Sequence, residues 1–172
     1  FVPLPKITKE KYKVTVIRFH KCDASIYDSV QVIKAALMQF DANYISYDNG
    51  DDGFVAGEIF ILDVEGYSFR QFLDLSKNVK TLLFYAGFLQ EGAPVTLIHN
   101  HISNTSTVLD GIMTMVKPIL SKKINDLVSF HRLGSGMLEH IDKEVLPADY
   151  GGDEKCIDEL YKDWMEVFKT KR

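Results

Sequence analysis

The sequence predicts a single α/β domain with a mostly parallel central sheet. The chain has 172 residues, and 46% of them are hydrophobic, which is enough to form one sizeable core. β-branched or apolar segments alternate with segments of helical periodicity, as in β-α-β units. Residues 54–62 are almost continuously apolar, which is typical of a parallel strand covered on both faces. There is no internal repeat and no convincing linker, so residues 1–172 are expected to act as one unit.

The first part of the chain is predicted to form a strand, a helix and a second strand. Residues 13–20 are a β-branched run suited to a buried strand. Ser25 and Asp28 have the spacing of a capping box at a helix start. The strand at residues 54–62 follows the helix and stops at a polar turn. One face of the helix carries Ile26, Val30, Ile33, Leu37 and Phe40.

The middle of the chain is predicted to be helical before it returns to the sheet. Ser68 and Gln71 form a second capping box, and Ser76 is placed to cap a further helix. That helix should end near Gly92, because a proline follows two residues later. Residues 95–102 then have the pattern of another strand.

The last part of the chain contains two more predicted helices and a short strand. Residues 107–117 have helical character, and Pro118 ends or kinks this helix. Residues 127–130 are a short strand, and residues 155–169 are an outer helix. The packing face of the outer helix consists of Ile157, Leu160, Tyr161, Trp164 and Phe168.

Composition and charge argue against several classes of function. The net charge of −4 and the sequence pI of about 5.7 argue against nucleic-acid binding, which requires a basic surface. No apolar stretch approaches the roughly 18 residues of a membrane span, and no signal-peptide pattern is present. Cys22 and Cys156 are too few for a disulfide framework, which favours a reducing, cytoplasmic compartment. Residues 1–12 have the character of a connector to a preceding segment.

Motifs of the common α/β enzymes are missing. The sequence has no GxSxG elbow, no GxxxxGK[ST] loop and no GxGxxG after a strand. His99 and His101 share one strand face and His131 lies on another strand, so they are either zinc ligands or packed strand histidines. Asp63 and Glu65 are either an acid–base pair or turn residues. We expect no enzymatic activity, no metal and no cofactor.

Two features of the sequence indicate an apolar cavity. In the helix at residues 107–117, apolar side chains cover nearly the whole circumference, so it is either a core helix or a helix that covers a cavity and meets a membrane. Glu58 lies within an apolar strand, where a carboxylate is costly unless it is paired or reaches water. It either binds the polar end of a ligand or meets solvent or a lysine.

Four motifs in the sequence resemble those of the CRAL-TRIO lipid-binding domain family. They are Gly57–Ser68 with the Asp-Val-Glu-Gly turn, Ala93–Asn104 with His-Ile-Ser-Asn, Val116–Leu120 with Lys-Pro, and Leu146–Gly152 with Leu-Pro-x-x-Tyr-Gly-Gly. Their order and spacing cover nearly all of the chain. The family resemblance implies a sheet with helices on one side and a hydrophobic pocket under a mobile gate helix at residues 108–120. It also implies that a helical segment normally precedes the domain.

The resemblance, together with the apolar pattern, predicts two sets of contact residues. A hydrophobic ligand is expected to contact Val30, Ile33, Leu37, Glu58, Phe60, Leu62, Tyr85, Leu89, Asn100, Ile102, Leu109, Ile112, Met113, Val116 and Leu120. A membrane surface is expected to contact Lys117, Lys122 and Lys123. Family members that bind phosphoinositides carry basic residues at positions that correspond to Thr96, Ile98 and Leu127 here, which argues against that specificity.

We therefore predict a non-catalytic, monomeric carrier of a hydrophobic small molecule such as a retinoid, tocopherol, carotenoid or other isoprenoid or lipid. It is expected in the cytoplasm, with transient contact to membranes and no contact with nucleic acid. The alternative is a signalling module of the same fold that docks to a membrane or a protein and has a filled core. A cavity of about 300 Å³ or more favours the carrier.

Overall fold

The protein was studied as a computed structural model. It describes residues 1–19, 23–46, 54–94, 96–105, 110, 113–114, 117–118, 120–132 and 134–170. None of the helices in these ranges has both the length and the apolar character needed to cross a bilayer.

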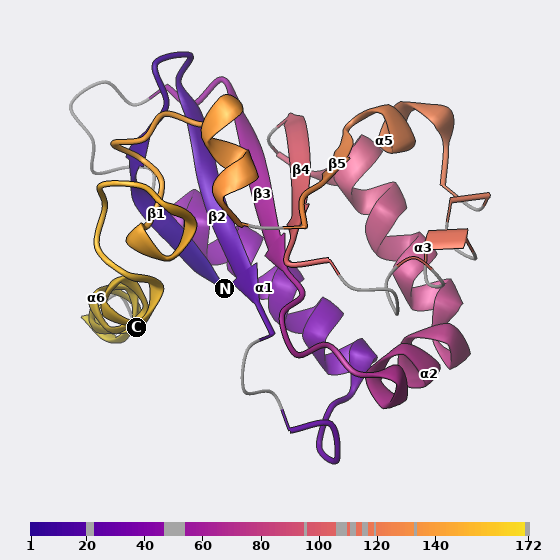
Figure 1. The fold of residues 1–172 in the computed structure, drawn as a ribbon. Coiled ribbons are helices and arrows are strands. Elements are labelled where there is room, and N and C mark those ends of the chain that lie inside the picture. The colour runs from indigo at the N-terminus through magenta and orange to yellow at the C-terminus, as the bar shows by residue number, and fades with distance from the viewer. Residues whose placement is uncertain are drawn as a thin grey trace.

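A sheet of five strands forms the centre of the molecule (Figure 1). The strands follow one another across the sheet in the order in which they occur along the chain. β1 is antiparallel to β2, and the remaining neighbours pair in parallel, which confirms the predicted fold class. The strands are β1 (Val2–Ile7), β2 (Tyr12–Arg18), β3 (Gly57–Asp63), β4 (Leu97–Ser103) and β5 (Val128–Phe130).

Helices occupy the connections and the C-terminal part of the described chain. α1 is the long helix between β2 and β3, and α2 and α3 lie between β3 and β4. α3 continues into a π-helical turn, η2, which ends at Gly92 as predicted. The helices are α1 (Ser29–Ser46), α2 (Phe69–Lys77), α3 (Val79–Gly87), η2 (Phe88–Gly92), α5 (Lys122–Asp126), η3 (Gly134–Glu139), η4 (Ala148–Tyr150) and α6 (Ile157–Thr170).

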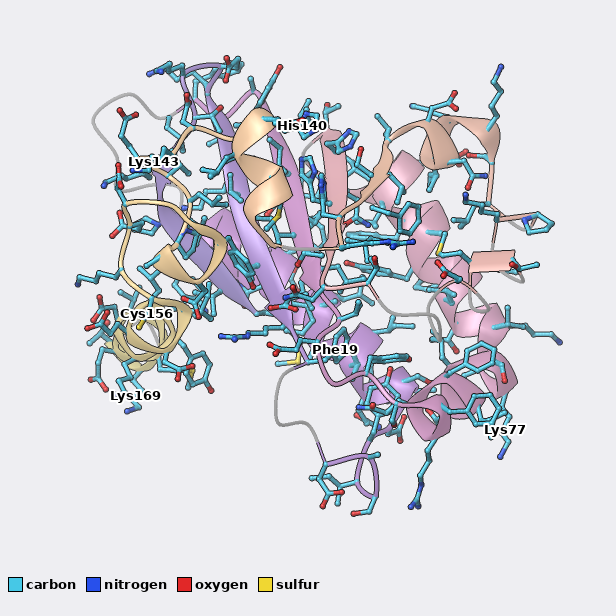
Figure 2. The ribbon with its side chains drawn as sticks, viewed as in Figure 1. Phe19, Lys77, His140, Lys143, Cys156 and Lys169 are labelled. Carbon is cyan, nitrogen blue, oxygen red and sulfur yellow. The ribbon has the colours of Figure 1, made fainter. Side chains whose placement is uncertain are left out.

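The strand order determines which face of the sheet the crossover helices cover. Crossovers between parallel strands are right-handed in nearly all proteins, and here each one steps in the same direction across the sheet. All of the crossovers therefore lie on one face, which we call the crossover face. The rest of the chain, from η3 to α6, returns over the opposite face, which we call the outer face (Figures 1 and 2).

The outer face carries the larger of the two buried apolar clusters. Odd-numbered β3 residues and even-numbered β1 and β2 residues point into it, and η3, η4 and α6 cover it. Its members are Val2, Leu4, Val14, Val16, Ile59, Ile61, Met137, Ile141, Val145, Leu146, Tyr150, Ile157 and Leu160.

Two local predictions about helix starts were wrong. Asp28, not Ser25, caps α1, because its carboxylate accepts the N–H groups of Val30 and Gln31 at 2.9 and 3.1 Å. Ser76 lies inside α2, where its hydroxyl donates to the carbonyl of Leu73, so it does not cap α3. The predicted capping box of Ser68 and Gln71 at the start of α2 is confirmed.

The prediction for residues 1–12 was also wrong. These residues do not form a connector, because β1 occupies Val2–Ile7 and pairs with β2. Val2 and Leu4 are buried in the outer-face core. The prolines that made this segment look irregular are compatible with an edge strand, since an edge strand has one side without ladder partners.

Candidate functional site

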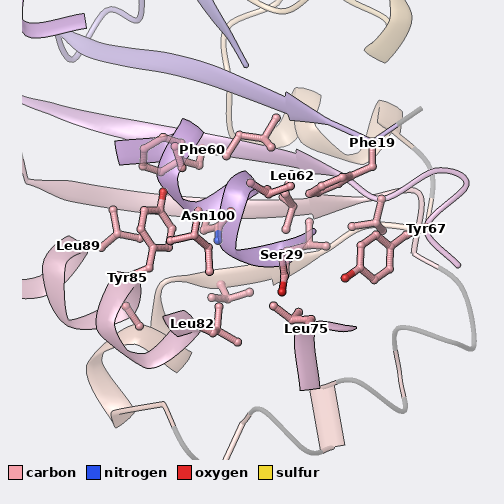
Figure 3. A pocket seen from close by; sticks show the side chains of 18 of the residues that line it. Phe19, Ser29, Phe60, Leu62, Tyr67, Leu75, Leu82, Tyr85, Leu89 and Asn100 are labelled. Atoms are coloured by element: carbon pink, nitrogen blue, oxygen red, sulfur yellow. The ribbon is translucent and has the colours of Figure 1, made fainter. Parts of the chain in front are cut away.

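A cavity of about 250 Å³ lies on the crossover face, between the sheet and the crossover helices (Figure 3). Side chains of β2, β3 and β4 form one wall, and side chains of α1, α2 and α3 form the other. None of the described side chains that line it carries a charge. The lining consists of Phe1, Ile17, Phe19, Tyr27, Ser29, Val32, Ile33, Ala36, Phe60, Leu62, Val64, Tyr67, Leu75, Leu82, Tyr85, Ala86, Leu89, Leu97, Asn100, Ile102, Met113, Leu120, Ile124 and Val128.

Strand alternation places the sheet residues in this wall, with one irregularity in β4. Phe60 and Leu62 of β3 face the cavity and pair with Asn100 and Ile102 of β4. The register shifts by one residue between Leu97 and His99 of β4. Because of this bulge, Leu97 and Asn100 both line the cavity although they differ in parity.

Gly57 permits the close approach of β3 and β4 beside this bulge. A Cβ atom at this position would overlap the side chain of Ile98 and the carbonyl oxygen of Thr96. Glu58, the next residue, donates its N–H to that same carbonyl at 2.9 Å. A glycine is therefore required where the strands first come together.

Asn100 provides a polar group within the apolar lining. Its Oδ1 atom is shielded from solvent and accepts no hydrogen bond from the part of the chain that the structure describes. A buried amide oxygen without a donor costs about 1–3 kcal/mol, so a donor on a bound molecule would be stabilised there.

Three further polar groups of the lining, those of Tyr27, Tyr67 and Ser29, have partners within the protein. The hydroxyl oxygens of Tyr27 and Tyr67 lie 3.2 Å apart, at the end of the cavity where Phe19 packs against both rings. Ser29 accepts a hydrogen bond from the Asn78 amide at 3.1 Å. This arrangement leaves Asn100 as the best-placed group to recognise a ligand.

Glu58 is buried but lies outside the main cavity. Thr15 donates its hydroxyl to Oε1 of Glu58 at 2.7 Å, and Lys13 is its register partner on β2. Burial lowers the pKa of Lys13, and the Glu58 carboxylate opposes this change. Burial raises the pKa of Tyr85, and Glu58 adds to that rise. Glu58 borders a separate, much smaller space, so of the two roles considered, the structure supports pairing within the protein.

The structure brings most of the predicted ligand contacts together. The predicted residues that line the cavity are Ile33, Phe60, Leu62, Tyr85, Leu89, Asn100, Ile102, Met113 and Leu120. Val30 and Leu37 do not line it, because the face of α1 turned toward the sheet runs through Ser29, Ile33, Ala36 and Phe40. Leu109, Ile112 and Val116 lie outside the described residues.

Several lining residues were not predicted from the sequence. Ser29, Val32 and Ala36 belong to α1, where small and polar side chains gave the apolar periodicity no signal at two of the three positions. Tyr27 and Tyr67 lie in turns, where periodicity gives no signal.

Only parts of the predicted gate segment, residues 108–120, are described. Asp110, Met113 and Thr114 are helical, and Thr114 donates its hydroxyl to the Asp110 carbonyl at 2.9 Å. The side-chain amide of Asn125 donates to the carbonyls of Lys117 and Leu120, at 3.1 and 3.2 Å. This contact fixes the C-terminal end of the segment against α5.

The three lysines predicted to contact a membrane are exposed. Lys117 places its ammonium group 5.4 Å from the ring centre of Phe130, and Lys122 and Lys123 lie on α5. Ser121 caps α5 by accepting the N–H of Ile124.

The histidines considered as zinc ligands lie on the outer face, away from the cavity. His101 Nδ1 is 2.9 Å from His131 Nε2, and the ring centres of His99 and His101 are 4.5 Å apart. Within the described ranges, no group of three or more histidine, cysteine, aspartate or glutamate side chains is arranged to hold a metal ion.

Asp63 joins three of the motifs noted in the sequence. Its Oδ1 accepts the N–H of Glu65 at 3.0 Å and the side-chain amide of Asn104 at 2.8 Å. Its Oδ2 accepts the hydroxyl of Tyr150 at 2.8 Å and lies 3.3 Å from Nε of Arg18. Asp63 and Glu65 are thus turn and network residues.

The tyrosine and glycines after Pro147 have a physical role in this network. Burial and the Asp63 carboxylate raise the pKa of Tyr150, so its hydroxyl remains a donor. Gly151 has φ +85°, and a Cβ atom on Gly152 would overlap the Leu146 carbonyl. This tight turn brings Tyr150 to Asp63. The sequence motifs that contain these two residues are therefore sites of close packing.

Comparison with known proteins agrees with this geometry. A model of the CRAL/TRIO domain matches residues 1–152, from β1 to the Gly151–Gly152 turn. The chain belongs to the CRAL/TRIO domain family. The match includes the cavity-lining strands and ends before α6.

Individual relatives of this CRAL/TRIO chain match over shorter stretches. It is 27% identical to the mouse "Alpha-tocopherol transfer protein-like" over 99 residues, which are 57% of this chain and 28% of the mouse protein. The human and Pongo abelii proteins of the same name are each 26% identical over the same shares. The aligned stretch thus spans less than a third of these relatives.

A solved structure supports the CRAL/TRIO fold. The crystal structure of Sfh5 superimposes with a TM-score of 0.62 and 15% sequence identity, covering 92% of this chain and 58% of that chain. At this identity, the likeness concerns the fold alone.

Proposed function

We propose that this chain binds and transfers a hydrophobic small molecule in the cavity on the crossover face, without catalysing a reaction on it. The observation that carries the proposal is the lining, in which the described side chains combine apolar and aromatic groups with one shielded acceptor and carry no charge. The volume of about 250 Å³ is below the roughly 300 Å³ expected for a carrier, so the character of the lining carries more weight than its size.

The chemistry of the lining favours a neutral ligand with one donor group. A carboxylate or phosphate would lose its hydration in this cavity with no cationic side chain among the described lining residues to replace it. A retinoid, tocopherol or other isoprenoid that ends in a hydroxyl group can instead donate to Asn100 Oδ1. The name of the mouse, human and Pongo abelii relatives refers to a tocopherol, which supports this class.

Native mass spectrometry tests the proposal directly. The purified protein is incubated with retinol, α-tocopherol, a carotenoid and phosphatidylinositol, and the bound mass is read before and after organic extraction. We expect a 1:1 complex with at least one neutral lipid. Failure to retain or bind any member of the panel would contradict the carrier role and favour the docking module with a filled core.

The role of Asn100 is tested with two related ligands. Asn100→Leu has the same branched shape and the same number of side-chain heavy atoms but cannot accept a hydrogen bond. We expect the affinity for a lipid alcohol to fall about tenfold, which corresponds to roughly one hydrogen bond, and the affinity for its hydrocarbon analogue to stay within about twofold. Equal losses for both ligands would show that Asn100 acts only by packing.

We also propose that residues 108–120 form the gate and that loading occurs at an anionic membrane surface. Lys117, Lys122 and Lys123 are exposed beside this segment, and each basic side chain near such a surface contributes about 1 kcal/mol. Phe69 on α2 and Phe84 on α3 are 60% and 65% exposed, and both helices line the same cavity. Their rings are suited to insertion between lipid headgroups.

Liposome sedimentation tests this membrane contact. The double variant Lys122→Glu/Lys123→Glu should bind vesicles with anionic lipid at least about tenfold more weakly than the wild type. The double variant Lys143→Glu/Lys155→Glu, on the outer side of the molecule, is the matched control. Equal losses in both would contradict a specific role for α5.

A further inference from the structure

Four histidines from separate parts of the chain meet on the outer face. His99 and His101 come from β4, His131 directly follows β5, and His140 follows η3. The ring centre of His101 lies 4.5 Å from that of His99, 5.1 Å from that of His131 and 5.2 Å from that of His140. We call these residues the histidine cluster; four of the five histidines of the sequence are in it.

The contact between His101 and His131 requires at least one neutral ring. Nδ1 of His101 and Nε2 of His131 are 2.9 Å apart, so one nitrogen donates and the other accepts. A protonated imidazole has only donors. If both rings were protonated, the contact would become a repulsion between two donors and two positive charges.

The surroundings of the cluster offer little compensation for added positive charge. His101 is 1% exposed, and its register neighbours on β3 and β5 are Ile61 and Ser129. Ser129 contacts His99 Nε2 at 2.8 Å, and Met137 and Ile141 of the covering segment are apolar. The one carboxylate that acts on the cluster, among the described residues, is Glu139 beside His131.

The pKa values of His99, His101 and His131 are lowered, as expected for rings with little compensation for positive charge. Burial, followed by the three neighbouring histidines, lowers the pKa of His101 to about 3. Burial and the neighbouring rings also lower the pKa of His99 and His131, while Glu139 opposes this for His131. His140 is exposed and labelled in Figure 2, so the cluster has a route for protons from solvent.

The cluster is linked through the backbone to the chain that leads into the predicted gate. His131 donates its N–H to the carbonyl of Ile102 at 2.8 Å and accepts the N–H of Thr105 at 3.3 Å. Thr105 comes three residues before the predicted gate, and Asn104 beside it has a left-handed φ of 57°. Displacement of His131 would therefore release the bond that holds Thr105.

We propose that the histidine cluster is a pH-sensitive latch, in which proton uptake separates His101 from His131 and frees the Thr105 segment from β5. The consequence for ligand release rests on the carrier function proposed above, but the latch itself does not. At neutral pH the rings of His101 and His131, whose pKa values are lowered, are neutral and the latch is closed. Acidification through the ordinary histidine pKa favours the separated state, because that state binds protons more readily.

Hydrogen exchange at the Thr105 amide tests the latch without any ligand. Between pH 7.5 and 5.5, with EDTA present, we expect the protection factor of this amide to fall about tenfold for each histidine that is released. The double variant His101→Asn/His131→Gln keeps nitrogen and oxygen atoms near the contacting positions but does not titrate. It should show less than about a threefold change.

Two further variants keep the test decisive if the double variant folds poorly. His140→Gln changes an exposed ring and removes one repulsive neighbour, so it should weaken the pH response of Thr105. His20→Gln removes the histidine that is not in the cluster and should respond like the wild type. No pH response in the wild type, or equal responses in the wild type and both cluster variants, would overturn the latch.

Release of a neutral fluorescent probe, N-phenyl-1-naphthylamine, separates the latch from the carrier function. If both proposals hold, the probe dissociates at least about tenfold faster at pH 5.5 than at pH 7.5, and the double variant abolishes this difference. If the wild type binds no probe at either pH, the carrier function loses support, and the Thr105 exchange still decides the latch. If the probe dissociation rate does not depend on pH while the exchange of the Thr105 amide does, the latch acts only on the backbone of residues 102–105.

Discussion

The two faces of the sheet are built from the same strands but differ in how densely they are covered. In β3, Ile59, Ile61 and Asp63 point into the closed outer face. Phe60 and Leu62 alternate with them and border a cavity of about 250 Å³. The two faces therefore have different roles. The cavity on the crossover face contributes few packing contacts, so most of the stability of the fold comes from the outer face.

The largest expected difference between the faces is in core truncation. Ile61→Ala removes a fully buried side chain from the outer face and should lower the free energy of unfolding by about 2–5 kcal/mol. Leu62→Ala, one residue along β3, should cost roughly 1 kcal/mol, since its side chain already borders empty space. Urea denaturation measures both values. Equal losses would contradict the proposal that the outer face contributes more stability than the crossover face.

The polar network of the outer face is expected to be the next most sensitive. Asp63→Asn leaves Arg18 without its buried counter-charge and should cost about 3 kcal/mol, at the low end for such a pair because Arg18 is partly exposed. Tyr150→Phe removes only one hydrogen bond to the same carboxylate and should cost about 1 kcal/mol. If thermal denaturation ranked Tyr150→Phe as the more damaging variant, the Tyr150 hydroxyl would support the network more than the Arg18–Asp63 ion pair does.

Filling the cavity should affect binding more than stability. Ala36→Phe places a ring into the cavity from α1 and should weaken binding of N-phenyl-1-naphthylamine tenfold or more, with unfolding changed by less than about 1 kcal/mol. Ala35→Phe, on the exposed side of the same helix turn, is the control and should bind normally. Fluorescence titration compares them, and undiminished binding to Ala36→Phe would place the probe elsewhere.

The smallest effect is a pH dependence that belongs to the outer face. Because the pKa of His101 is lowered from 6.5 to about 3, the unfolded chain binds the proton first as the pH falls. Stability is therefore complete above pH 6.5 and declines below it, by about 1.4 kcal/mol between pH 7.5 and 5.5 for this residue.

Urea titrations at several pH values measure this slope, and His101→Asn should reduce it by the share of this residue, since His99 and His131 also have lowered pKa values. The carboxyl groups of Asp142 and Glu154, whose pKa values are lowered by hydrogen bonds from lysines, add losses only below about pH 4.5, outside this window. A wild type that is equally stable at pH 7.5 and 5.5 would contradict the description of His101 as a buried neutral ring.

The sequence was sufficient to predict the alternation of strands and helices and the apolar, two-sided character of β3. Periodicity was less exact for α1, where the face that meets the sheet includes Ser29 and Ala36, while Val30 and Leu37 were predicted in their place. The β4 bulge beside Gly57 was not predictable, because it depends on how two strands approach each other. His140 joins the cluster through the return of η3 over the sheet, and no local pattern specifies that contact.

The sequential strand order has a consequence for how this architecture tolerates change. Since every crossover lies on one face, an insertion or deletion in a crossover alters the cavity without touching the residues that pack on the other face. Substitutions that change the ligand and substitutions that preserve the stability of the fold can then occur in separate stretches of the chain. For protein engineering, the crossover segments between β2 and β5 are accordingly the place to graft new specificity, with the strands and the stretch from η3 to α6 left unaltered.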